Sequence, residues 1–249
     1  MKTSPFSLDK WLRFFTNWEA MAEGFTRTLV IALLSLTLAL AVGMVLGILS
    51  SSNNKALRRA VRCYVELFQN IPLVIQIYFF YYVLPYAGVV MDQFAIGVLG
   101  VGLYTGAYIS EVVRTGIQSI PTGQMEAAKS QGFTYVQAMR LIILPQAFRL
   151  ILPPLTNQAV NLIKNTSVLA IIAGGDLMYQ ADSLAASKLF YGPAYVTTGL
   201  LYFILCFPLS TMARKLEQRM HRKAAAPVAV SKKAPAQALA APQTQMGGI

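Results

Sequence analysis

The chain has 249 residues, of which 55% are hydrophobic and only 12% are charged. Soluble domains carry about 25% charged residues, so this composition excludes an ordinary soluble domain and indicates a membrane protein. The net charge of +11 does not point to nucleic acid, because long uncharged runs fill most of the chain. One His (His221) and two Cys (Cys63 and Cys206) leave almost no residues for a metal site, a thiol dyad or a His-based triad.

Five apolar runs are long enough to cross a bilayer as helices, which takes about 20 residues. Four carry no charge, and one contains only Lys164. In chain order they are Thr28 to Asn54, Leu67 to Met91, Gln93 to Ser110, Leu150 to Gly175 and Leu189 to Ala213. We therefore predict an all-α membrane protein with five transmembrane helices. Small residues four apart predict close helix packing at Ala39, Gly43 and Gly47 and at Gly102 and Gly106.

Lys and Arg gather on one side of the predicted membrane. Segments 55–62 and 111–149 and the tail after residue 213 hold fifteen of them, whereas the opposite connections hold Asp92, Asp176, Asp182 and Lys188. The positive-inside rule places the basic side in the cytoplasm, with the N-terminus outside and the C-terminus inside. The predicted regions are a periplasmic leader (1–24), a transmembrane domain (25–215) and a cytoplasmic tail (216–249) that is too poor in large apolar residues to pack and is largely disordered.

The longest connection on the basic side, 111–149, contains the features of two short helices joined by a hinge. Glu126, Ala127 and Ala128 favour a helix, and Gly132 can end it in the left-handed conformation. A second helix from about Thr134 is expected to stop before Pro145, since the residue before a proline disfavours helical geometry. From the residues alone, this segment is either a docking element for a cytoplasmic partner or an amphipathic surface loop.

Charged side chains at membrane depth face a cavity or a partner, because lipid does not solvate them. Glu111 and Arg114 are three apart and are expected to pair. Lys164 has three possible roles, which are to bind a substrate carboxylate, to balance Glu66 or Glu111, or to reach an interface. Together with uncharged polar groups these residues form a candidate translocation path suited to a zwitterion: Glu66, Asn70, Gln76, Glu111, Asn157, Asn161, Lys164 and Thr166, with Gln158 and Asn165 beside them.

The spacing Glu126-Ala127-Ala128, three residues, Gly132, nine residues, Ile142, one residue, Leu144-Pro145 resembles the signature loop of the permease subunits of ATP-binding-cassette importers. Segments 65–76, 111–121 and 157–176 are similar to the polar-amino-acid (histidine/glutamine/glutamate-type) branch of that family. The resemblance covers roughly residues 25 to 215. The sequence departs from the commoner motif of that branch at Gln69, a position where the family frequently has Arg.

The resemblance implies a five-helix inner-membrane core that dimerises, with itself or with a sister permease, around a translocation path. It implies two ATPase subunits that hold ATP and Mg, and a periplasmic or lipid-anchored amino-acid-binding protein. The coupling loop would seat in the ATPase through Glu126, Ala127, Ala128, Gly132, Ile142, Leu144 and Pro145. The expected cargo is a polar amino acid, with glutamate, aspartate or glutamine leading. The chain itself has no Gly-x4-Gly-Lys-Ser/Thr nucleotide loop and is not expected to be an enzyme or to bind a cofactor, a metal or nucleic acid.

Two alternatives belong to other classes. An ion-coupled secondary carrier or channel would also use buried Glu and Lys, but it would not need the coupling loop, and such carriers commonly contain two repeated halves. An intramembrane protease is disfavoured because the only His lies outside the apolar runs and no Ser-Lys or paired-Asp arrangement is apparent within them.

Overall fold

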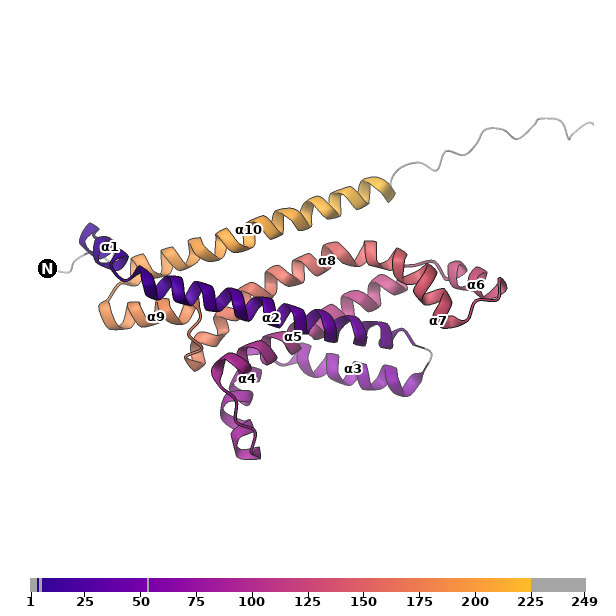
Figure 1. Cartoon of the computed structure of the whole chain (residues 1–249), viewed down its shortest axis with the longest axis horizontal. Helices are drawn as coiled ribbons and strands as arrows, with labels where there is room; N and C mark the ends of the chain where they lie inside the picture. Colours follow the sequence, from indigo (N-terminus) through magenta and orange to yellow (C-terminus); the bar gives the residue numbers. More distant parts are fainter. Residues whose placement is uncertain (1–3, 5, 53, 225–249) are drawn as a thin grey trace, which may run out of the picture.

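In the computed structural model the chain is an elongated bundle of helices (Figure 1). Residues 4, 6–52 and 54–224 are described, and this part of the chain contains helices and no strand. The elements are α1 (Leu8–Phe15), α2 (Trp18–Ser50), α3 (Lys55–Asn70), α4 (Leu73–Tyr78), η1 (Phe79–Val83), η2 (Leu84–Ala87), α5 (Gln93–Gln118), α6 (Thr122–Ser130), α7 (Tyr135–Ala138), η3 (Met139–Ile143), α8 (Leu144–Asn165), η4 (Thr166–Ile172), α9 (Leu177–Lys188) and α10 (Tyr191–Ala224).

Four helical segments are each long and apolar enough to cross a membrane: Trp18–Ser50, Gln93–Gln118, Tyr135–Ile172 and Tyr191–Gln218. The run from Leu67 to Met91 differs from the straight helix that its composition predicts. The chain bends by 101° between Lys55–Asn70 and Leu73–Ala87, and this bent pair is the fifth candidate span. The bend lies at Ile71, which is extended because Pro72 follows it. The side chain of Gln76 donates to the carbonyls of Phe68 (2.9 Å) and Ile71 (2.8 Å) at the break.

The predicted stop before Pro145 is wrong. The helix that begins at Tyr135 continues through the π-helical turn Met139–Ile143 into α8, with Pro145 in the first turn of α8. Inside a helix, the ring of a proline clashes with the carbonyl four residues before it. For Pro145 that residue is Leu141, which lies in the π turn, where the helix is locally wider. The side chain of Gln146 donates to the Ile142 carbonyl at 2.9 Å, which partners one of the carbonyls near the proline.

The centre of the bundle is the contact between α2 and α5. A Cβ at Gly43 would lie 2.5 Å from the Ile109 side chain, and a Cβ at Gly47 would lie 2.5 Å from that of Val113. Only glycine allows the two backbones to approach this closely, as the spacing of small residues predicts. The main core, which includes Ile109 and Val113, continues from this contact onto α8 and η4.

The bundle has two ends, which carry different elements (Figure 1). The loop end carries α6 and α7, the start of α3 and the last turns of α2 and α5. The α9 end carries α1, α9 and the first turns of α2 and α10. The last turns of α10 run out towards the loop end. Helix α10 extends through Ala224, so residues 216–224 of the predicted tail are helical, and 225–249 lie outside the described residues.

The α9 end has a second apolar cluster. Phe14 and Met21 are fully buried there against Leu177, Ala181 and Phe190. The predicted leader 1–24 thus contains α1 and the first turns of α2, and it packs on the bundle. The N–H of Leu177 donates to the hydroxyl of Thr28 at 2.9 Å, which ties α9 to α2 across 149 residues of sequence.

Candidate functional site

The loop that joins α5 to α8 folds back on itself at Gly132. This residue has φ +83°, which confirms the predicted left-handed end of the first short helix. The N–H of Gly132 donates to Lys129 at 2.9 Å, and that of Phe133 donates to Ala128 at 3.1 Å. This pair of bonds is the Schellman motif that closes a helix C-terminus. No heavy atom lies within 4 Å of a Cβ built at Gly132, so the backbone conformation alone requires glycine.

The second half of the loop is capped and anchored. Thr134 and Gln137 form a reciprocal capping box at the start of α7. The hydroxyl of Tyr135 donates to the carbonyl of Ser51 at 3.1 Å, which ties the loop to the end of α2. Glu126, Ala127 and Gly132 are exposed, and Ala128 is buried under them. The loop is therefore a compact projection with its own hydrogen bonds, as a docking element requires. Ile142 and Leu144 are half-buried, and Pro145 is exposed.

A charged groove of about 610 Å³ runs between α3 and α5 near the loop end. It brings together two residues of the candidate path, Glu66 and Glu111. Its other polar lining residues are Ser50, Lys55, Arg58, Arg59, Arg62, Gln69, Ser110, Arg114 and Gln118. Glu111 and Gln69 also line a neighbouring pocket, where Gln158 of α8 joins them.

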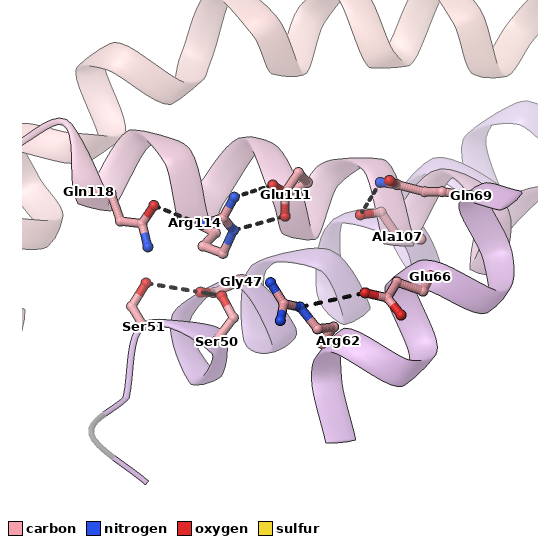
Figure 2. Close-up of polar contacts among 10 residues, drawn as sticks. All are labelled: Gly47, Ser50, Ser51, Arg62, Glu66, Gln69, Ala107, Glu111, Arg114 and Gln118. Carbon is pink, nitrogen blue, oxygen red and sulfur yellow. Dashed lines mark hydrogen bonds and ion pairs between the residues drawn. The ribbon is translucent and has the colours of Figure 1, made fainter. Parts of the chain in front are cut away.

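Each carboxylate in the groove has an Arg partner (Figure 2). Arg114 binds Glu111 with two N–H groups, one of them at 2.9 Å, and donates a third hydrogen bond to Gln118 at 2.7 Å. This pair confirms the prediction from their spacing. Arg62 lies 3.5 Å from Glu66 on α3. Neither carboxylate forms a salt bridge with Lys164 in the described part of the chain, so the alternative in which Lys164 balances them within one copy is not observed.

Helix α8 carries the second half of the candidate path. Asn157, Asn161 and Lys164 follow one another at helical spacing, and all three are exposed. They lie on a segment that is apolar enough to span a membrane. Lipid gives no hydrogen bonds to such groups, so this polar stripe requires either water or another protein chain.

Three predicted path residues serve the fold in this structure. Gln76 is buried and binds the carbonyls at the α3–α4 bend. Thr166 is buried and donates to the Ile163 carbonyl at 2.7 Å. Asn70 is exposed, and its side chain donates to the Glu66 carbonyl at 2.8 Å. Sequence reasoning missed Arg62 and Gln118 as partners, although their four-residue spacing from Glu66 and Arg114 is a usable signal.

Comparison with known proteins is decisive for the family. The family of binding-protein-dependent transport system inner membrane components matches residues 39–222. The chain belongs to this family. The chain is therefore the permease subunit of an ATP-binding-cassette importer, and such permeases are not themselves enzymes.

Relatives match the permease over nearly their whole length. The probable glutamine ABC transporter permease protein GlnM of Bacillus subtilis is 42% identical over 208 residues, which is 84% of this chain and 96% of the relative. The L-cystine transport system permease protein TcyB of Bacillus subtilis is 32% identical and covers 82% and 88% of the two chains. A crystal structure of an amino acid ABC transporter with histidines superimposes with a TM-score of 0.78 at 28% identity and covers 88% of this permease and all of that chain.

Proposed function

We propose that this permease moves amino acids, with glutamine, glutamate and aspartate as the leading candidates. The names of its relatives support a cargo of this class, because GlnM is a probable glutamine permease at 42% identity. The exposed amides and the ammonium on α8 suit a zwitterion, which presents both a carboxylate and an amine to its lining. Selection among these amino acids would rest first with the binding protein that delivers them.

The observation that carries the mechanism is the exposed loop from Glu126 to Pro145. In the proposal it docks on an ATPase subunit, and hydrolysis of ATP with Mg in that partner moves the loop and the attached helix α8. Continuity through the π turn supports this, since α7, η3 and α8 form one uninterrupted helix from the docking element into the membrane. A displacement of the loop would reach Asn157, Asn161 and Lys164 along that helix.

The complete transporter would contain two such permeases, identical or paired with a sister chain, and two ATPase subunits. The exposed polar stripe on α8 supports a second copy, because a facing permease would shield it from lipid and enclose a path. The basic residues of α3 and the C-terminal turns of α10 lie towards the loop end, which supports a cytoplasmic loop end by the positive-inside rule (Figure 1). The N-terminus and the amino-acid-binding protein would then be on the opposite side of the inner membrane.

The test is uptake by proteoliposomes that contain the permease, its ATPase and its binding protein. We expect uptake of labelled glutamine, glutamate or aspartate only when ATP is on the side of the ATPase, and no uptake from an ion gradient alone. A variant of the ATPase that binds but does not hydrolyse ATP is the control. Gradient-driven uptake by the permease alone would instead support an ion-coupled carrier and would overturn the proposal.

A further inference from the structure

Helix α1 has three distinct faces. Leu8, Leu12 and Phe15 recur at helical spacing and are 74%, 62% and 54% exposed, with Trp11 on the same side. Asp9 and Arg13 form an ion pair at 3.0 Å on the opposite side. Between these two faces, Phe14 is fully buried against the bundle. One face thus holds the helix on the protein, one is polar, and one is apolar and uncovered within the described residues.

Helix α10 shows the depth at which α1 lies. Its first charged residue is Arg214, and residues 191–213 before it are uncharged, which amounts to about 35 Å of helix at 1.5 Å per residue. The hydrocarbon core is about 30 Å thick, so Tyr191 lies near its boundary at the α9 end. The ring of Phe14 contacts that of Phe190 edge to face, with centroids 6.3 Å apart. This contact places α1 at the same boundary.

The apolar face of α1 lies at the same end of the bundle as exposed aromatic side chains of the kind that contact lipid. Trp18, Tyr191 and Tyr195, in the first turns of α2 and α10, are 42%, 48% and 41% exposed, and Trp and Tyr are the residues enriched where a membrane meets water. The ring of Phe15 on α1 lies 6.3 Å from that of Trp18 on α2. Exposed apolar side chains then follow both spans towards the loop end: Val30, Leu33 and Leu34 on α2, and Leu200, Phe203 and Ile204 on α10.

We infer that α1 is an interfacial helix, whose face of Leu8, Trp11, Leu12 and Phe15 inserts into the lipid of the leaflet at the α9 end. The polar side, with Asp9 and Arg13, faces water. An amphipathic helix at the junction of headgroups and acyl chains takes this orientation. Through the bond between Lys188 and Asn17, the short connection to α2 is also joined to α9, so insertion of α1 fixes the α9 end against the membrane surface. This role is independent of the cargo and of the coupling loop.

The two Trp of this chain, Trp11 and Trp18, both lie in this segment, so Trp fluorescence excited at wavelengths that Tyr does not absorb reports on it alone. The experiment uses the full-length permease with Trp18→Phe in phosphatidylcholine–phosphatidylglycerol vesicles, in which Trp11 is the single Trp. Lipids brominated near the headgroup end of the acyl chain should quench Trp11 at least twofold more than lipids brominated near the chain terminus. Aqueous iodide should quench it several-fold less than free tryptophan.

Matched variants on the two faces sharpen the test. Leu8→Asp with Leu12→Asp should lower quenching by brominated lipid at least twofold and raise quenching by iodide. The double variant Asp9→Asn with Arg13→Gln on the polar side leaves the net charge unchanged and should change neither. Strong quenching of the parent Trp11 by iodide and none by brominated lipid would overturn the inference, since α1 would lie in water. Protection of Trp11 from both quenchers would also overturn it, because a protein surface would then cover the apolar face.

Discussion

The two ends of the bundle differ in the burial of their polar contacts, which at the α9 end include a fully buried one and at the loop end are mostly exposed. At the α9 end, residues far apart in sequence bind one another, as in the bond from the Leu177 N–H to the Thr28 hydroxyl. At the loop end, most polar contacts join residues three or four apart, such as Arg62 with Glu66 and Thr134 with Gln137. The hydrogen bonds from Tyr135 to the Ser51 carbonyl and from Gln69 to the Ala107 carbonyl are long-range exceptions there.

We therefore expect the α9 end to serve mainly the stability of the fold and the loop end to serve mainly docking. Long-range contacts fix the arrangement of helices, so a substitution at the α9 end should destabilise the whole chain. Mostly exposed short-range contacts at the loop end cap the loop and pair the carboxylates of the groove with Arg partners on the same helix. Changes there should therefore alter function more than the free energy of unfolding.

The largest expected effect concerns Asp176, which caps α9 at the α9 end. The residue is fully buried, its Oδ2 accepts from the Met178 N–H at 3.0 Å, and its Oδ1 lacks a partner within the described residues. Burial raises the pKa of this carboxyl to about 6 from an ordinary 3.8, against the opposing effect of the Met178 N–H. The folded state therefore binds this proton more tightly than the unfolded state, and folding is disfavoured once the carboxylate is ionised.

Because the pKa of Asp176 is higher in the folded than in the unfolded state, its effect on stability changes within a defined pH range. The stability of the parent should fall as pH rises from about 4 to about 6 and stay level above that, by an amount on the order of 3 kcal/mol from this group. Asp176→Asn removes the proton and keeps a capping oxygen, so it should lose this part of the pH dependence. Denaturant unfolding of both proteins in detergent, at pH 4 to 7, measures the difference. Parallel pH profiles for parent and variant would contradict the account of the α9 end.

Gly24 should show the next largest effect. A Cβ there would lie 3.0 Å from the Leu177 Cα and 3.1 Å from the Asp176 carbonyl oxygen, so the α2 and α9 backbones would have to separate. Gly24→Ala should lower the free energy of unfolding by about 1–3 kcal/mol, as overpacking does. Gly199→Ala on α10 is the control, because its Cβ would meet no heavy atom within 4 Å. Equal thermal midpoints for the two variants would show that α2 and α9 are not held this closely.

The smallest effect on stability is expected at the loop end. Arg62 and Glu66 form an exposed pair on one helix, so Arg62→Gln should change the free energy of unfolding by less than about 0.5 kcal/mol. The same substitution frees a carboxylate in the groove and should change uptake more than stability. Uptake and thermal unfolding of the same preparation test this. A loss of stability as large as that of Gly24→Ala would remove the distinction between the two ends.

Local signals predicted much of this fold. Uncharged runs located α2, α5 and α10, and the hinge at Gly132 followed from residue type, because such features depend on neighbours along the chain. The bend at Pro72 and the passage through Pro145 were not predicted. Both depend on side chains, Gln76 and Gln146, that bind carbonyls near a proline.

The candidate site also contains features that the local sequence predicted and features that it did not. The pair of Glu111 and Arg114 followed from spacing within one helix. The groove between α3 and α5 and the burial of Asp176 depend on helices that meet only in the folded chain, and no local pattern contains that information. The roles of the coupling-loop and path residues stay predictions.

The most direct test of the coupling loop compares Gly132→Ala with Gly123→Ala. Both glycines are on α6 or its end, and neither has a heavy atom within 4 Å of a built Cβ, but only Gly132 has a positive φ. A side chain costs about 1 kcal/mol or more in that conformation. The quantities to measure are the affinity of the permease for its ATPase and the substrate-stimulated ATP hydrolysis of the complex with its binding protein. Gly132→Ala should weaken association with the ATPase about fivefold and lower the stimulated rate, since 1 kcal/mol corresponds to that factor, while Gly123→Ala should match the parent. Parent-like association and hydrolysis for both variants would contradict the assignment of this loop as the coupling element.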